Sequence, residues 1–294
     1  RVGFLLGTDH PYPRMMRWLP SLPPRLDPLV AAIERIATAD PFLMSAAIAY
    51  NAIFALVPLV FSAVAAVSMI GGDPDGLQSV EQTLATEFPA DVAEFLIPIL
   101  EDAEGAIGSM GPLVLVVSLL VALWSGSRAI YAVQKALRMI ENMEETRPYL
   151  VTRGLGILFT VGAGIALALS YFAVILGNAL TDRLAQLGLQ FDTAAWISIG
   201  AILVWVVGVL YAIYHWGLPE PIRMSALSAL VATVILAVAT WLAAILIPTF
   251  GGGALAAFGS VGVVLVWSYT LGIIIISVPA VVPSIVDVAR GRTP

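Results

Sequence analysis

Long uninterrupted runs of apolar residues dominate the chain and alternate with short polar segments. Each run holds about 20 residues or more, which is the length that an α-helix needs to cross a lipid bilayer. At about 1.5 Å of rise per residue, each run spans roughly 30 Å. We therefore predict an all-α polytopic membrane protein with six transmembrane helices, at residues 42–70, 112–131, 154–180, 194–216, 224–248 and 257–285.

The polar segments complete the predicted organisation. Apolar residues recur at helical spacing in the first loop and from Leu26 to Ala39, so we expect amphipathic helices at both places. The predicted parts are a cytoplasmic N-terminal segment 1–41, a membrane domain 42–285 with an outer helical loop 71–110 and an inner basic helix and turn 128–153, and a cytoplasmic tail 286–294.

Composition supports a membrane protein. The chain is 60% hydrophobic and 12% charged, whereas soluble domains carry about 25% charged residues. The chain contains no cysteine, which excludes disulfides, thiolate metal sites and cysteine nucleophiles.

The distribution of charge predicts the orientation. If both termini are cytoplasmic, 13 of the 14 Lys and Arg residues lie on the inner side, as the positive-inside rule requires. The outer loop then carries nine carboxylates and no Lys or Arg. This acidic loop is either a solvated cap or a surface that attracts ions or a partner protein.

A basic segment follows the second apolar run. Residues 123–148 read LWSGSRAIYAVQKALRMIENMEETRP. In a helix, Arg128, Lys135 and Arg138 lie within about 80° of one another, so they form a basic face opposite an apolar one. Pro148 restricts Arg147 to extended conformations and ends the element. The segment is either a positive-inside anchor followed by a turn, or a contact surface for a headgroup or substrate.

This segment resembles the YihY/BrkB family of bacterial inner-membrane proteins, which was formerly mislabelled ribonuclease BN. The Leu-Trp-Ser-x-Ser stretch, the basic helix and the Glu-Glu-Thr-Arg-Pro closure carry the likeness. Three further segments agree in order and spacing: AAIAYNAIFALVPLV (46–60), PIRMSALSALVATVIL (221–236) and FGSVGVVLVWSY (258–269). The resemblance implies six helices in the bacterial inner membrane, and members of the family have been called transporters and linked to envelope lipid export.

The last apolar run departs from the family pattern. Many members keep an acidic position late in the final helix, whereas this chain reads SVPAVVPSI, with Pro279 and Pro283 and no carboxylate. A mechanism that needs that carboxylate is therefore in doubt here.

The polar residues in the interiors of the apolar runs are all uncharged. Tyr50, Asn51 and Pro58 lie in the first run, and Pro58 frees a backbone carbonyl near residue 54. This part is either a packing kink or the wall of a cavity. Small residues spaced by four are expected at helix contacts, and aromatic residues near run ends, including Trp124, Tyr214, His215 and Trp216, are expected at the membrane interface. The two predicted small-residue stripes are Gly156, Thr160, Gly164 and Ala168, and Ser225, Ala229, Thr233 and Ala237.

Signatures of enzymes and of cofactor sites are missing from the sequence. There is no phosphate-binding loop, no His-Glu-x-x-His and no Gly-x-Ser-x-Gly. The two histidines lie far from any pair of carboxylates suited to metal or acid–base chemistry. We therefore expect no enzyme, no cofactor, no metal site and no nucleic-acid partner, and we reject a nuclease.

Two functions remain. The first is a transporter or flippase-like protein that moves a lipid or another amphipathic, anionic substrate through a mostly neutral cavity with a basic cytoplasmic face. The second is a non-transporting envelope scaffold. Membrane lipids are the expected partners, and six helices could enclose a cavity as one chain or only as a homo-oligomer. The candidate lipid or substrate contacts are Arg128, Lys135, Arg138, Arg147, Arg223, Tyr50, Asn51, Pro58, Trp124, Ser125 and Ser127.

Overall fold

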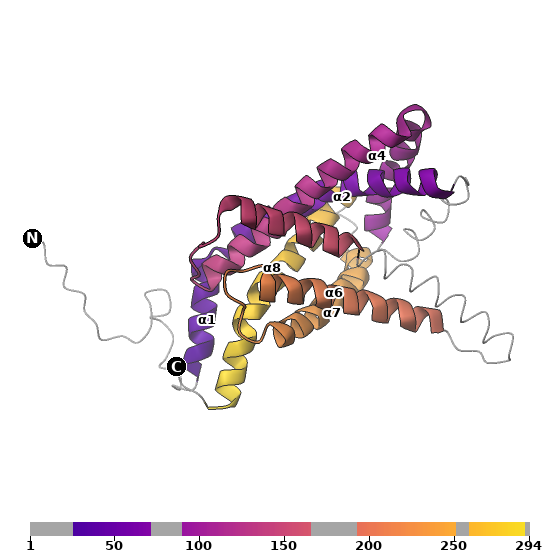
Figure 1. The fold of residues 1–294 in the computed structure, drawn as a ribbon. Helices are drawn as coiled ribbons and strands as arrows, with labels where there is room; N and C mark the ends of the chain where they lie inside the picture. The colour runs from indigo at the N-terminus through magenta and orange to yellow at the C-terminus, as the bar shows by residue number, and fades with distance from the viewer. Residues whose placement is uncertain (1–25, 72–89, 166–192, 251–258, 292–294) are drawn as a thin grey trace, which may run out of the picture.

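The regular structure of the chain is helical throughout the part that is described. The computed structural model describes residues 26–71, 90–165, 193–250 and 259–291, and no strand occurs among these residues (Figure 1). The N-terminal 25 residues, much of the predicted outer loop, the later part of the third apolar run, the last outer turn and the end of the tail lie outside the described residues. These ranges are 1–25, 72–89, 166–192, 251–258 and 292–294.

The described helices follow the apolar runs closely. In chain order they are α1 (Asp27–Thr38), α2 (Pro41–Gly71), α4 (Ala90–Ile140), the helix Tyr149–Ile165, α6 (Thr193–Trp216), α7 (Ser225–Phe250) and α8 (Gly259–Ala289). Helix α1 occupies the segment where the sequence predicts a short amphipathic helix, and Val30 and Ala32 bury its apolar side.

Within the described residues, four segments are long and apolar enough to cross a membrane. They are Pro112–Ile140, Ile199–Trp216, Ser225–Ile245 and Gly262–Ala289. Two shorter apolar helical segments lie at the first and third predicted runs, Pro41–Ala55 and Tyr149–Ile165. Membrane-competent helices are thus confirmed at four of the six predicted positions, and the six-span count stays a prediction.

The second predicted membrane helix begins at Pro112, as an apolar segment within a longer helix that also includes the end of the predicted outer loop. Residues 90–140 form one helical element of 51 residues, with Pro98 and Pro112 inside it. Each proline removes one N–H from the helical hydrogen bonds, and the ribbon of α4 bends near the top of Figure 1. The same element continues to Ile140, so the predicted helical extension of the second run is present.

Helix α8 is the central element of the described bundle. It contacts α1, α2, α4 and α7, and Val264, Ile276 and Ala280 are almost completely buried along it. Helix α2 packs along α4, and α6 packs on α7. Because α8 contacts four other helices, a change in its position would be transmitted to most of the bundle.

Small residues allow a close crossing between α4 and the helix Tyr149–Ile165. A Cβ atom added to Gly126 would lie 2.6 Å from Cγ2 of Thr160, and one added to Gly156 would lie 3.1 Å from the Ser127 carbonyl oxygen. This confirms the predicted packing role of Gly156 and Thr160. In the second stripe Ser225, Ala229 and Thr233 are buried, whereas Ala237 and the first stripe's Gly164 are exposed, and Ala168 lies outside the described residues.

The Tyr214 hydroxyl donates a hydrogen bond to a backbone carbonyl of α8 that has no donor within the helix. Pro279 has no N–H, so the carbonyl of Ile275 loses its helical donor. Tyr214 of α6 donates its hydroxyl to that carbonyl at 2.7 Å. The side chain of Tyr214 is fully buried, so its predicted place at the membrane interface is wrong. The need of a freed carbonyl for a donor explains why a phenol lies in this apolar core.

We predict that Tyr214→Phe lowers the free energy of unfolding by about 1 to 3 kcal/mol, because the Ile275 carbonyl is left buried and unpaired. Thermal unfolding in detergent measures the change, and Tyr211→Phe is the matched control. In a Pro279→Ala background the new N–H can bond to the same carbonyl, so Tyr214→Phe should cost less there. An equal cost in both backgrounds contradicts the assignment.

Candidate functional site at the charged end

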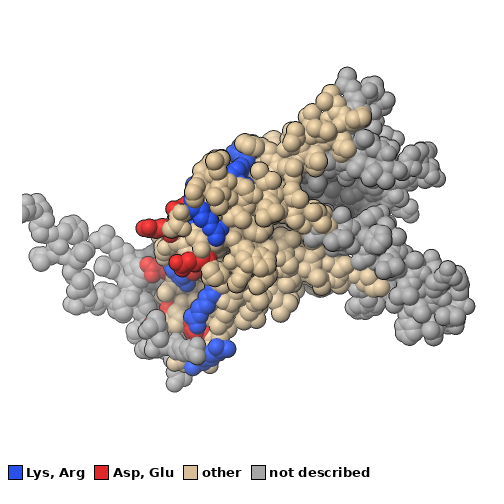
Figure 2. All heavy atoms as spheres, in the orientation of Figure 1, with Lys and Arg blue, Asp and Glu red and all other residues tan. Residues whose placement is uncertain are grey.

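Charged side chains gather at one end of the described bundle. On the face drawn in Figure 2, the visible Lys, Arg, Asp and Glu side chains lie at the end where α1 and the end of α8 lie, and a broad uncharged surface lies beside them. We call this region the charged end. It consists of α1, the last turns of α4, the turn 141–148, residues 217–224 between α6 and α7, and the end of α8.

An ion pair fastens α1 to the end of α4. Arg35 donates through Nη1 to Oε2 of Glu141 at 2.9 Å. Burial raises the pKa of the Glu141 carboxyl above its usual value, and the charge and hydrogen bond of Arg35 oppose this rise. Removal from water therefore outweighs the attraction of the partner.

Contacts among nearby residues of the chain hold the turn after α4. Asn142 has a positive φ of 52°, a left-handed conformation that asparagine tolerates at the end of a helix. Arg138 forms an ion pair with Glu145 at 2.7 Å, and Glu145 also accepts the backbone N–H of Arg147 at 3.2 Å. The guanidinium of Arg138 lies 5.9 Å from the centre of the Tyr131 ring.

Arg138 does not belong to an exposed basic face. The residue is 7% exposed, because its position on α4 is rotated by about 80° from Arg128 toward the core side. Its guanidinium forms an ion pair with Glu145. The predicted basic face therefore reduces to Arg128 and Lys135, whose side chains are exposed.

Arg147 clamps the turn to the end of α6. Its Nη1 donates to the Trp216 carbonyl at 3.3 Å, and its Nη2 donates to the Leu218 carbonyl. The last carbonyls of a helix have no helical donors and carry the negative end of the helix dipole, so a guanidinium fits there. The arginine of the Glu-Glu-Thr-Arg-Pro segment thus holds two parts of the chain together.

A second clamp holds the connection between α6 and α7 on its other side. Arg223 binds Asp287 of α8 with two hydrogen bonds, of 2.6 and 2.8 Å. The hydrogen bonds and charge of Asp287 raise the pKa of the Arg223 guanidinium. Like Arg147, Arg223 is therefore engaged within the protein.

Trp124, Arg128 and Lys135 share an exposed stripe on α4. Positions 117, 124, 128 and 135 lie within about 20° of the direction of Val117, and all four side chains are exposed. The guanidinium of Arg153 lies over the Trp124 ring at 4.3 Å, which is cation–π geometry. Among the described residues, neither Arg128 nor Lys135 forms an ion pair.

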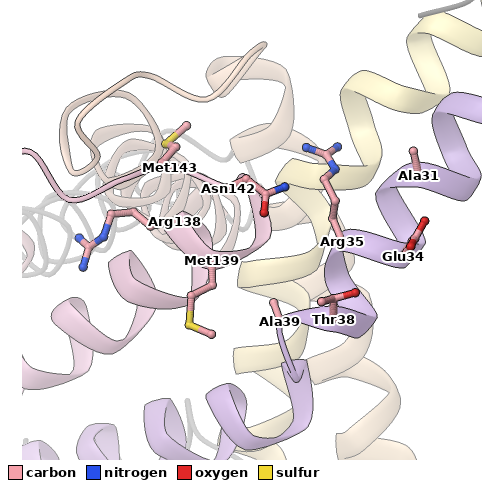
Figure 3. A pocket seen from close by; sticks show the side chains of 9 residues that line it. All are labelled: Ala31, Glu34, Arg35, Thr38, Ala39, Arg138, Met139, Asn142 and Met143. Carbon is pink, nitrogen blue, oxygen red and sulfur yellow. The ribbon is translucent and has the colours of Figure 1, made fainter. Parts of the chain in front are cut away.

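A groove of about 570 Å³ lies between α1 and the end of α4. Figure 3 shows side chains of α1 on one side and side chains from the end of α4 on the other. The groove is lined by Ala31, Glu34, Arg35, Thr38, Ala39, Arg138, Met139, Asn142 and Met143. Of the predicted contact residues, only Arg138 lies on it.

The remaining candidates do not join this site. Tyr50 is exposed and its ring packs on Phe54 at 4.5 Å between centroids. Asn51 donates its side-chain amide to the Ala47 carbonyl at 2.7 Å. Pro58 lies inside α2 without ending it. Ser125 is half-buried, and Ser127 is fully buried, with its hydroxyl donating to the Trp124 carbonyl at 2.8 Å.

Sequence reasoning missed the buried amide of Gln134. This side chain is fully buried, and neither its nitrogen nor its oxygen is hydrogen-bonded to a described residue. Its position one residue from Lys135 gave no hint of burial, although Val133, Ala136 and Leu137 beside it are typical of a core face. Among the described residues, no group of three His, Asp or Glu side chains could hold a metal ion.

Comparisons with known proteins identify a family. The model of the family described as "Virulence factor BrkB" matches residues 32–281. No curated protein matches the chain, and no solved structure matches it. The matched range includes the described apolar helices, with α8 as far as Val281, and most of the charged end.

The raised pKa of Glu141 predicts a pH dependence of stability. A folded-state pKa above the unfolded value makes a contribution that is fully present below the unfolded pKa and is lost as the pH rises through the folded pKa. Wild type should therefore gain stability relative to Glu141→Gln as the pH falls from neutral toward about 4.5. Thermal unfolding of both proteins across this range measures the difference, and a constant difference contradicts the prediction.

The clamps predict that cations of the charged end differ in their effect on stability. Arg147→Ala should lower the free energy of unfolding by about 2 kcal/mol, because it removes charge-assisted hydrogen bonds. Arg147→Lys should recover only part of the loss, since an ammonium lacks the planar fork. Lys135→Ala, the matched control, should change stability by less than about 0.5 kcal/mol. Similar losses for Arg147→Ala and Lys135→Ala in chemical denaturation would contradict the clamp.

Proposed function

Because the chain belongs to the BrkB family, matching its model over residues 32–281, we propose that it is an inner-membrane transporter. In this proposal it moves an anionic lipid or a similar amphipathic molecule across the bilayer in a flippase-like manner. Six helices cross the membrane, with α2 and the helix that begins at Tyr149 added to the four long apolar segments. The protein performs no covalent chemistry.

In this proposal the charged end faces the cytoplasm. The cationic residues that the structure describes lie toward the same end of the bundle as α1 and the end of α8. The positive-inside rule assigns that end to the cytoplasm. The anionic headgroups of the inner leaflet would then meet the exposed cations of α4.

The stripe on α4 is the observation that carries the proposal. Val117 and Trp124 are 51% and 55% exposed and are followed on the same side of the helix by Arg128 and Lys135. An apolar surface that ends in an aromatic ring and then in two cations matches the order of tail, interface and headgroup in an anionic lipid. Arg128 lies about 6 Å beyond Trp124 along the helix axis, and Lys135 lies about 10 Å further.

Most other arginines of the charged end are already bound within the protein, which distinguishes them from the cations of the stripe. Arg35, Arg138 and Arg223 are bound to carboxylates, and Arg147 is bound to backbone carbonyls. We therefore withdraw Arg138, Arg147 and Arg223 from the first contact with substrate and assign that contact to Arg128 and Lys135, next to Trp124.

A transport assay tests the proposal. The purified protein is reconstituted into vesicles with a fluorescent phosphatidylglycerol, and lipid movement is followed by quenching of the outer leaflet. Because each cation near a membrane surface contributes about 1 kcal/mol, Arg128→Gln combined with Lys135→Gln should slow movement about tenfold or more. Arg290→Gln, an exposed cation at the same end, is the matched control and should leave the rate unchanged.

Three outcomes would each contradict a part of the proposal. Equal lipid movement in vesicles with and without protein would reject transport and favour the scaffold, which crosslinking to a stable partner in cells would then support. Equal rates for the double variant and wild type would remove the stripe from the mechanism. Equal movement of phosphatidylcholine would reject selection for anionic lipids.

A further inference from the structure

The fully buried amide of Gln134 lies beneath the connection between α6 and α7. A Cβ atom added to Gly217, the residue after α6, would lie 3.2 Å from Nε2 of Gln134. The surrounding core is apolar and includes Leu210, Ile213 and Leu218. An amide group held in such a core without a hydrogen bond to any described residue is unfavourable. Its presence therefore calls for a physical reason.

The covering segment, residues 217–224, is fastened from two sides. Arg147 holds the carbonyls of Trp216 and Leu218, and Arg223 holds Asp287 of α8. Figure 1 shows this connection between α6 and α7 at the same end as α1. Both fasteners are polar contacts at the surface of the charged end, which water can replace more readily than buried apolar packing.

The two ends of the segment have unusual backbone requirements. A side chain at Gly217 would place its Cβ 2.5 Å from the Ile213 carbonyl oxygen, so only glycine fits. Met224 has a positive φ of 61°, a conformation that is strained for a residue with a side chain. Such positions at the ends of a segment are suited to absorb a change of backbone direction.

We propose that residues 217–224 are a gate, which moves away from the end of α4 and exposes Gln134 to the aqueous side of the charged end. The open gate lets the Gln134 amide, which can both donate and accept, bind the polar headgroup of the substrate. The identity of that ligand rests on the proposed transport function, whereas the opening of the gate does not. Arg147 and Arg223 keep the gate closed, together with the buried side chains of Leu218 and Ile222.

Cysteine labelling tests the opening directly. The chain has no cysteine, so a single introduced thiol reports one position in the full-length protein. Gln134→Cys in membrane vesicles should react slowly with a small water-soluble methanethiosulfonate reagent. Adding Arg147→Ala should raise the rate about tenfold or more, the change expected from loss of a charge-assisted hydrogen bond. Adding Arg35→Ala, which instead breaks the ion pair between α1 and Glu141, should leave the rate unchanged.

A reciprocal control separates the gate from general loosening. Ala32 is a fully buried residue of α1, so Ala32→Cys should respond to Arg35→Ala and not to Arg147→Ala. If Arg147→Ala leaves the Gln134→Cys rate unchanged, or raises the Ala32→Cys rate equally, the gate is rejected. The labelling result does not depend on lipid transport.

Gln134→Leu tests the contact with substrate without disturbing the clamps. This change removes the unpaired amide and keeps a similar volume, so the thermal unfolding midpoint should rise. The movement of fluorescent phosphatidylglycerol should nevertheless slow about tenfold, by loss of a hydrogen bond to a charged headgroup. A higher midpoint with an unchanged rate would show that Gln134 does not touch the substrate. If wild type itself moves no lipid, the transport proposal fails and the labelling experiment alone decides the gate.

Discussion

Polar groups that leave water must find partners inside the protein, and this constraint organises the described part of the chain. The apolar helices leave few such groups in the interior, because their backbone hydrogen bonds are made within each helix. Where Pro279 breaks this pattern in α8, Tyr214 supplies a donor to the freed Ile275 carbonyl. Where α6 ends and its carbonyls lose their donors, Arg147 supplies them.

The same constraint separates the cations of the charged end into two kinds. Arg35, Arg138 and Arg223 hold carboxylates, and in doing so they join α1 to α4, α4 to its following turn, and the α6–α7 connection to α8. Arg128 and Lys135 are exposed on α4 in line with Trp124. The first kind joins parts of the fold, and the proposed contact with an anionic lipid rests on the second kind.

The sequence predicted the features that depend on local pattern, and it missed those that depend on distant partners. Apolar runs predicted the helices, and the spacing of Gly156 and Thr160 predicted a close helix contact. No local pattern could pair Arg35 with Glu141, which lie 106 positions apart. Helical spacing placed Arg138 near the basic face but could not tell that Glu145 would bind it on the core side. Gln134 and Tyr214 were missed or misplaced for the same reason, since their burial depends on how α4, α6 and α8 meet.

The proposed transport requires that the charged end faces the cytoplasm while the beginning of α4 faces the opposite side. Labelling single cysteines with a membrane-impermeant maleimide in intact cells and in inverted vesicles tests this most directly. We expect Glu101→Cys to react only in intact cells and Lys135→Cys to react only in inverted vesicles. Reaction of both positions from the same side would contradict the account, because α4 would then not cross the membrane between them.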